Sequence, residues 1–216
     1  MSSVLLFGGR SLLDKTILRE NFLRIPEVSK VLRDAQKELE VLQESPFDVF
    51  SFAMSDDKNF HANLPWKELV VQLFQIGLFQ RLQKTSLKTK FMIGNSVDTS
   101  AVDVCLGKKT LSDLILKFVE EMGADKTLDS NTELLVGHKL ELSKLYVLVE
   151  GVYVESLDGK SAQWLLDELS KDYLIDQIIV LGSTESVVLE SSLNHVMDSL
   201  ALDPLLSWMF PRLQSA

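Results

Sequence analysis

The chain has 216 residues, of which 46% are hydrophobic and 25% are charged, and its formal net charge is −9. This length and composition suit one globular domain over residues 1–216 and exclude a disordered or fibrous chain. The negative charge disfavours DNA or RNA as a partner, because affinity for a phosphate backbone depends on Lys and Arg. The chain starts without a cationic lead, and no apolar run reaches the roughly 18 residues of a membrane span, so we expect a cytoplasmic protein with no membrane segment.

The first half of the chain alternates strand-like and helix-like segments. Residues 4–7 are an apolar run closed by two glycines, which predicts a buried strand entering a tight loop. Apolar residues recur at helical spacing over 27–42 and again from 64 to about 84, so both stretches are predicted helices. Residues 47–54 fit either a strand or a loop packed on the core. Residues 91–93 are short and fully apolar, which places them at the centre of a sheet.

The second half continues this alternation. Thr110 and Asp113 have the spacing of a capping box, and the apolar stripe that follows predicts a helix ending at Gly123. Further strands are predicted at 134–136, within 146–154 and at 175–181, and further helices at 163–169 and through 189–200. Alternating strands and helices indicate an α/β fold with a doubly wound, mostly parallel sheet.

Ser96 lies where the central strand is expected to turn into a helix. Enzymes that use serine as a nucleophile hold it on a strained corner of this kind, with backbone N–H groups facing the developing oxyanion. Gly94 stands two residues before Ser96, but Asp98 stands where such an elbow needs a second small residue. A serine at a helix start is also a common N-cap, so the pattern leaves a nucleophile position and a simple cap both open.

Five segments resemble the malonyl-CoA:acyl-carrier-protein transacylase family, which includes the polyketide-synthase acyltransferases. The most specific is "AVDVCLGKKTLSDLI", which is similar to the family's pattern after the nucleophile. The other four are "VLLFGGRS" at the opening strand, the helix from Trp66 to Leu82, Gly94-Asn95-Ser96 against the family's Gly-His-Ser, and "SAQWLLDELSKDYLIDQIIVLGST" near the end.

The resemblance implies an α/β-hydrolase-like acyltransferase core with Ser96 at the nucleophile position. It further implies acyl-CoA as a possible ligand and an acyl carrier protein or a ketosynthase as the partner, in polyketide or fatty-acid biosynthesis, with no cofactor. The remaining site residues that it implies are Gly9, Arg10 and Val97 in the oxyanion region and Gly94, Asn95 and Asp98 in the elbow.

The chain also departs from the family pattern. Residues 123–146 are too few for the family's ferredoxin-like subdomain, which we expect to be absent or vestigial. The family's catalytic histidine segment is missing; His138 is the nearest candidate base, although "LLVGHKLEL" also resembles a non-catalytic family stretch. Glu121 falls at or beside the arginine that pairs with a malonyl carboxylate, and would repel that charge. Arg10 and Ser11 replace the oxyanion-loop Gln-Gly.

Other side chains have both a structural and a functional interpretation. The single cysteine, Cys105, has apolar neighbours and is expected to be a small core residue, not a reactive thiol. With three scattered histidines it offers no zinc-like spacing, so no metal is expected. A group of lysines forms either a solvated face or a docking patch for an acidic carrier protein, and comprises Lys84, Lys88, Lys90, Lys108 and Lys109.

The sequence therefore predicts a truncated, degenerate acyltransferase-like protein. Its expected role is binding to a carrier protein, a ketosynthase or a second copy of itself, because losing a nucleophile and base unit costs about 10⁶-fold in rate. The alternative is an active acyltransferase or acyl-thioester hydrolase that uses Ser96. Apolar residues at 202–210 either close the core or form a partner surface.

Overall fold

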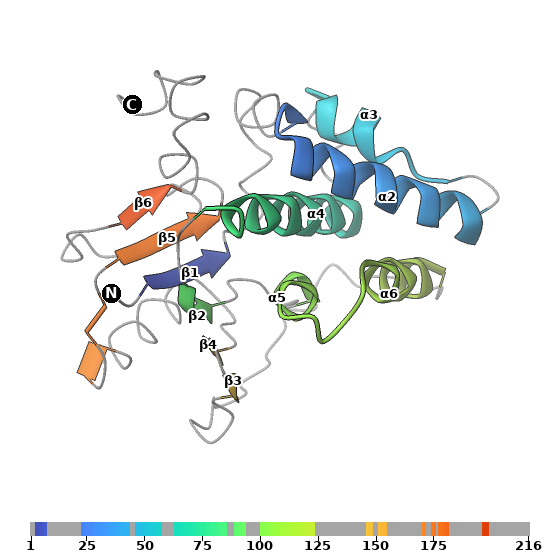
Figure 1. Cartoon of the computed structure of the whole chain (residues 1–216). Coiled ribbons are helices and arrows are strands. Elements are labelled where there is room, and N and C mark those ends of the chain that lie inside the picture. The colour runs from blue at the N-terminus through green and yellow to red at the C-terminus, as the bar shows by residue number, and fades with distance from the viewer. Residues whose placement is uncertain are drawn as a thin grey trace.

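The computed structural model describes residues 3–7, 23–43, 46–57, 63–85, 89–93, 100–123, 146–148, 151–154, 170–171, 174–175, 177–181 and 196–198. The strands in these ranges are β1 (Ser3–Phe7), β2 (Thr89–Ile93), β3 (Tyr146–Leu148), β4 (Gly151–Val154), β5 (Gln177–Leu181) and β6 (Val196–Asp198). The helices are α2 (Pro26–Leu42), α3 (Val49–Met54), α4 (Leu64–Leu82), α5 (Ser100–Cys105) and α6 (Leu111–Gly123). Figure 1 shows the strands gathered in one sheet with the helices in a layer beside it.

The sheet has the strand order β3-β4-β2-β1-β5-β6. Every neighbouring pair is parallel except β3 and β4, which pair antiparallel. The prediction of an α/β fold with a mostly parallel sheet is thus confirmed. So is the interior position of residues 91–93, because β2 lies between β1 and β4.

Side chains on both faces of the inner strands are buried. One set belongs to the same hydrophobic cluster as the helices and comprises Leu5, Phe7, Ile179 and Leu181. The residues that alternate with this set are also at most 2% exposed, and they are Val4, Phe91 and Ile178. Strands buried on both faces are typical of parallel sheets, and they explain why these runs are continuously apolar and not alternating.

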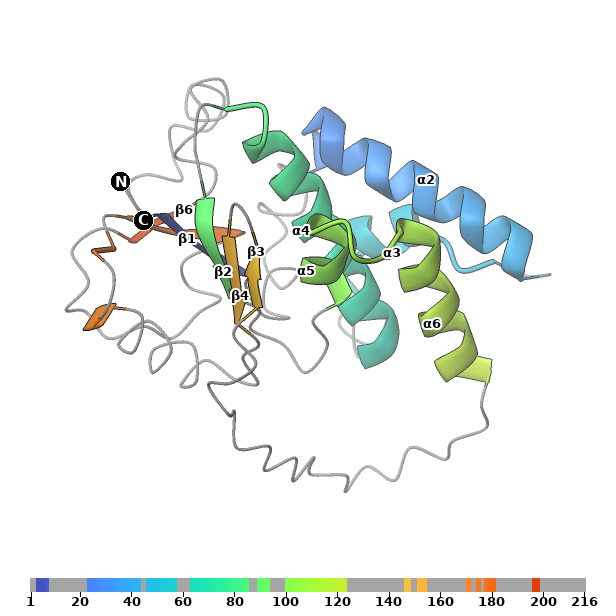
Figure 2. The same ribbon diagram turned by 60° about the horizontal axis from the view of Figure 1, so that its bottom comes forward.

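Helix α4 is the centre of the helical layer. It packs against α2, α5 and α6, and it reaches the sheet at β5. Residues 69–79 of α4 are all buried, so the helix has no solvent-facing side over three turns. Figure 2 shows that α2 to α6 all lie on the same side of the sheet. The predicted helices at 27–42 and 64–84 are confirmed, with α4 ending at Leu82.

The prediction of a strand or loop at 47–54 is wrong, because this stretch contains helix α3. Asp48 caps it by accepting hydrogen bonds from the backbone N–H groups of Phe50 and Ser51. These bonds, first of all that from the Ser51 N–H, hold the pKa of Asp48 below its usual range. The N–H of Val49 donates to the side-chain oxygen of Gln36 on α2, 3.1 Å away, so a tertiary contact fixes where the helix starts.

Two predictions in the second half also need correction. Residues 196–198, assigned to a helix, form strand β6, because they gain backbone hydrogen bonds by pairing with β5. The run 146–154 is divided into β3 and β4, which pair antiparallel with Leu148 opposite Gly151. The predicted strand at 134–136 and helix at 163–169 lie outside the described residues.

Helices α2 and α4 cross at a close backbone contact. A Cβ atom added at Gly77 of α4 would lie 2.5 Å from the Cα and 2.9 Å from the backbone nitrogen of Val28 on α2. Real Cβ atoms do not approach backbone this closely, so the crossing requires glycine. The same crossing carries an ion pair: Glu27 Oε1 lies 2.6 Å from Lys84 Nζ and 3.6 Å from Arg81 Nη1.

Replacing Gly77 by alanine should destabilise the protein by about 1–3 kcal/mol, because the methyl group forces two backbones apart. Alanine is otherwise the better helix former by roughly 0.5–1 kcal/mol, so the sign of the change reports the crossing itself. Urea unfolding of Gly77→Ala measures it. Lys37→Ala, on the exposed side of α2, is the control and should change stability by less than about 0.5 kcal/mol. A stability for Gly77→Ala equal to that of the native protein would contradict the close contact.

The Glu27 ion pair makes stability depend on pH. Burial alone raises the pKa of Glu27, but the hydrogen bond from Lys84 and the charges of Arg81 and Lys84 outweigh it, so the pKa lies below its usual range. The carboxylate therefore adds stability that is fully present above the pKa of unfolded glutamate, and that stability is lost as the pH falls through the lowered, folded-state pKa. Glu27→Gln should cost about 1 kcal/mol at pH 7, since Lys84 is largely exposed, and the difference from the native protein should shrink below pH 4.

Urea titrations between pH 3 and pH 7 check this dependence. Glu38→Gln, on the same helix, removes an equal charge and serves as the control. A gap between native protein and Glu27→Gln that does not change with pH would contradict the assignment.

Candidate functional site

The structure brings together the strand ends that lead to the predicted site. Ile93 at the end of β2 pairs with Leu6 of β1 on one side and with Val154 of β4 on the other. Because the three strands are parallel, their carboxyl ends lie at one edge of the sheet. Helix α5 begins at Ser100, so the segment that contains Ser96 joins the carboxyl end of β2 to the start of a helix.

The predicted site residues themselves lie outside the described ranges. They are Gly9, Arg10, Gly94, Asn95, Ser96, Val97, Asp98 and His138. The structure therefore locates the two strands that precede the oxyanion region and the elbow. The assignment of Ser96 as nucleophile and of His138 as base remains a prediction.

Helix α5, which follows the elbow segment, is attached to α6 at both of its ends. At its start, Ser100 is 1% exposed, and its hydroxyl accepts a hydrogen bond of 3.4 Å from the ammonium of Lys117 on α6. Toward its end, Asp103 pairs with Lys109 at 3.0 Å. The turn between the helices contains Gly107 with φ of +70°, a conformation that favours glycine. These contacts fix the helix start to which the Ser96 segment connects.

The predicted capping box at the start of α6 is confirmed. The backbone N–H of Thr110 donates to Asp113 Oδ2 at 2.8 Å, and the N–H of Asp113 donates to the Thr110 hydroxyl at 3.1 Å. The first of these bonds, helped by the Thr110 hydroxyl, lowers the pKa of the Asp113 carboxyl. Leu114, Ile115 and Phe118 of α6 are buried, so the cap sets the register of the face that packs on the core.

Helix α4 carries a polar side chain that sequence reasoning did not single out. Gln72 is 2% exposed, and neither its amide nitrogen nor its amide oxygen has a partner among the described residues. At about 100° per residue, Gln72 lies roughly 140° around the helix from Gly77, so it points away from α2. A glutamine within an apolar helical run is the sequence signal for it, but that signal does not distinguish a buried amide from an exposed one.

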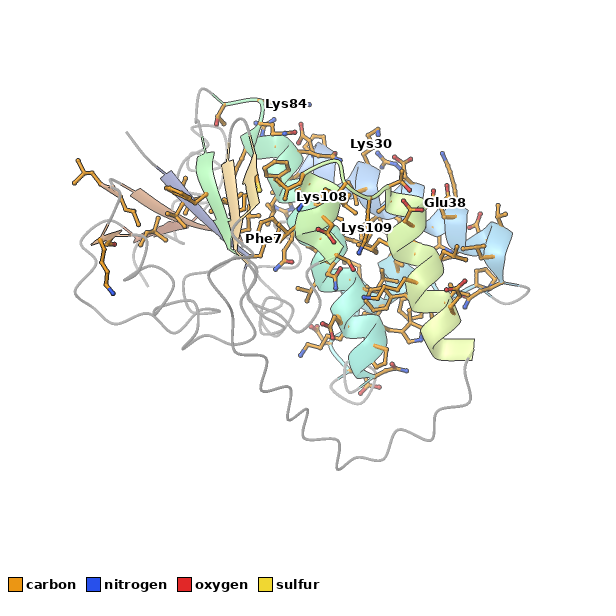
Figure 3. All side chains as sticks on the ribbon, turned by 90° about the horizontal axis from the view of Figure 1, so that it is seen from below. Phe7, Lys30, Glu38, Lys84, Lys108 and Lys109 are labelled. Carbon is orange, nitrogen blue, oxygen red and sulfur yellow. The ribbon has the colours of Figure 1, made fainter. Side chains whose placement is uncertain are left out.

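The lysines of the predicted docking patch are found at two places on the helical layer. Lys84 lies at the end of α4, and Lys108 and Lys109 lie between α5 and α6 (Figure 3). Lys84 is paired with Glu27 and Lys109 with Asp103, which reduces the net positive charge at both places. Lys88 and the side chain of Lys90 lie outside what the structure describes. The structure does not join these lysines into one patch.

Comparisons with models of protein families and with curated proteins find nothing that matches this chain. The acyltransferase resemblance therefore rests on the sequence segments alone. Among the helices that the structure describes, none is both long and apolar enough to cross a bilayer. Its described residues also contain no group of three or more metal-ligating side chains.

Cys105 packs against the core at the end of α5, and burial raises the pKa of its thiol. The thiolate is the reactive form, so the native protein should react with an alkylating reagent at pH 8 at least about tenfold more slowly than the urea-unfolded chain. Mass spectrometry measures this without ambiguity, because Cys105 is the single cysteine. Equal rates in the folded and unfolded states would contradict the packing of this side chain.

Proposed function

We propose that this protein is an acyltransferase-like binding protein of polyketide or fatty-acid assembly, in which Ser96 keeps the position of a nucleophile but not its efficiency. The observation that carries the proposal is the alignment of Leu6, Ile93 and Val154 on three parallel strands. It brings the chain that leads to Arg10 and the chain that leads to Ser96 out of the sheet side by side. An acyl thioester could reach both segments at this edge.

The finer fold in this proposal is a doubly wound acyltransferase core. Helices α2 to α6 lie on one side of the sheet (Figure 2), as right-handed crossovers from β1 to β2 and from β2 to β4 require. The return from β4 to β5 runs in the opposite direction and would place its helix on the other side. The burial of Val4, Phe91 and Ile178 on that second face supports a covering layer there.

Catalysis is expected to be weak for reasons of charge and missing groups. The sequence lacks the family's histidine segment, and the carboxylate of Glu121 stands where an arginine would bind a carboxylated acyl group. Losing a nucleophile and base unit typically costs about 10⁶-fold in rate. A fold retained without this machinery suits the binding of a carrier protein, a ketosynthase or a second copy of the chain in the cytoplasm.

For a carrier partner, the exposed Lys108 supports docking by electrostatic steering. Lys109 next to it is held by Asp103, and the capping box fixes the turn that presents both. The positive side chains therefore extend from a rigid connection between α5 and α6. Such charges change the association rate more than the final affinity.

The second candidate is an active serine acyltransferase or acyl-thioester hydrolase. Strand β4, next to β2, favours it, because the residue after Val154 is the ionisable Glu155. A carboxylate that leaves the sheet beside the elbow segment could accept the proton of Ser96 in place of an imidazole. In this candidate, Ser96 is acylated by a CoA or carrier thioester and passes the acyl group to a pantetheine thiol or to water.

The two candidates differ in one measurement. We expect no acyl adduct on the native protein by intact mass after incubation with acetyl-, malonyl- or longer acyl-CoAs, and micromolar binding to an acyl carrier protein that weakens about threefold to tenfold in Lys108→Glu. The control for the latter is Lys37→Glu, which makes the same charge change on the exposed side of α2.

An adduct that disappears in Ser96→Ala but persists in Ser112→Ala would establish the active enzyme instead. Its loss in Glu155→Gln or in His138→Ala would then identify the base. If the protein forms no adduct and binds neither a carrier protein nor a ketosynthase, the binding proposal is wrong.

A further inference from the structure

The strand order reverses between β1 and β5. From β1 the chain moves to β2 and β4 on one side, and from β5 it moves to β6 on the other. Connections that leave in opposite directions open a crevice at the carboxyl ends of the two strands, which is where open α/β sheets bind their ligands. This crevice lies on the opposite side of β1 from the Ser96 segment.

The two strands reach this crevice at the same level. Phe7, the last residue of β1, pairs with Leu181, the last residue of β5, and the arrowheads of both strands point the same way (Figure 1). Phe7 is 2% exposed and Leu181 is 0% exposed, so packing holds both strand ends in place. The residues that follow the two strands therefore leave the sheet next to each other, about 5 Å apart.

Those following residues have matching chemistry. After Phe7 come Gly8, Gly9, Arg10 and Ser11, and after Leu181 come Gly182, Ser183 and Thr184. Glycine lets backbone N–H groups approach an anion closely, and hydroxyl groups donate further hydrogen bonds. A guanidinium binds two phosphate oxygens at once. No acidic residue interrupts either run, although the chain as a whole is acidic.

We infer that the crevice between β1 and β5 binds a phosphate ester, with Arg10 and Ser183 as its main side-chain donors. Within the proposed function, on which this choice of ligand rests, the phosphate is that of the phosphopantetheine arm, which CoA and carrier proteins share. The Arg10 segment then lies between two sites, with the phosphate on the β5 side and the thioester on the side of Ser96. The positions of β2 and β5, two strands or roughly 10 Å apart, set that separation.

Isothermal titration with 4′-phosphopantetheine and with pantetheine tests the inference, because the two probes differ only in the phosphate. We expect the phosphorylated probe to bind at least about tenfold more tightly. Arg10→Gln and, independently, Ser183→Ala should reduce that difference, while Arg24→Gln, which removes an equal charge at an exposed position, should preserve it. Thermal unfolding of each variant separates a lost contact from a lost fold.

The probes also separate this inference from the proposed function. If pantetheine and 4′-phosphopantetheine bind equally, or if Arg10→Gln and Ser183→Ala both leave the difference intact, the phosphate site is wrong while acyl-thioester binding stands. If inorganic phosphate and AMP bind in an Arg10-dependent way and neither pantetheine probe binds more tightly than phosphate alone, the phosphate site stands with a different ligand, and the proposed function fails. Absence of binding by all of these probes overturns both.

Discussion

Helix α4 is buried on every side between residues 69 and 79, and at Gly77 its backbone lies so close to α2 that no side chain fits between them. The helix is placed by its neighbours on all sides: α2 through the glycine contact and the Glu27 ion pair, α5 and α6 opposite, and β5 at the sheet. Because α4 leads directly into β2, the position of this helix fixes the strand that ends at Ile93. The candidate site depends on that strand.

The carboxyl edge of the sheet combines an open approach with a rigid base. β1, β2, β4 and β5 all end there in parallel, and the last residues of β1 and β5 are fully packed. Polar chemistry is then supplied by the segments that leave the sheet, where glycine, serine and arginine replace the apolar residues of the strands. Two functions can share such an edge because each pair of neighbouring strands presents a different pair of segments.

Local patterns that depend on nearby residues were predictable. The helical spacing at 27–42 and the reciprocal bonds between Thr110 and Asp113 involve side chains within a few residues of one another. The helix at 49–54 was missed although Asp48 has the chemistry of an N-cap and Val49, Phe52 and Ala53 have helical spacing. Aromatic and β-branched residues suggested a strand, whereas contact with Gln36 on α2 and stacking of Phe47 on Trp66 favour the helix.

The sequence by itself determined the fold class, the approximate limits of the main helices, the apolar core strands and the glycine-rich ends of those strands, because apolar periodicity and turn chemistry are local. Only the tertiary structure decided the strand order, the pairing that makes 196–198 a strand, the burial of Gln72 and the partners of Lys84 and Lys109. Each of these depends on contacts between residues far apart in the chain. Their free energy comes from excluding water at surfaces that exist only when the whole chain is folded.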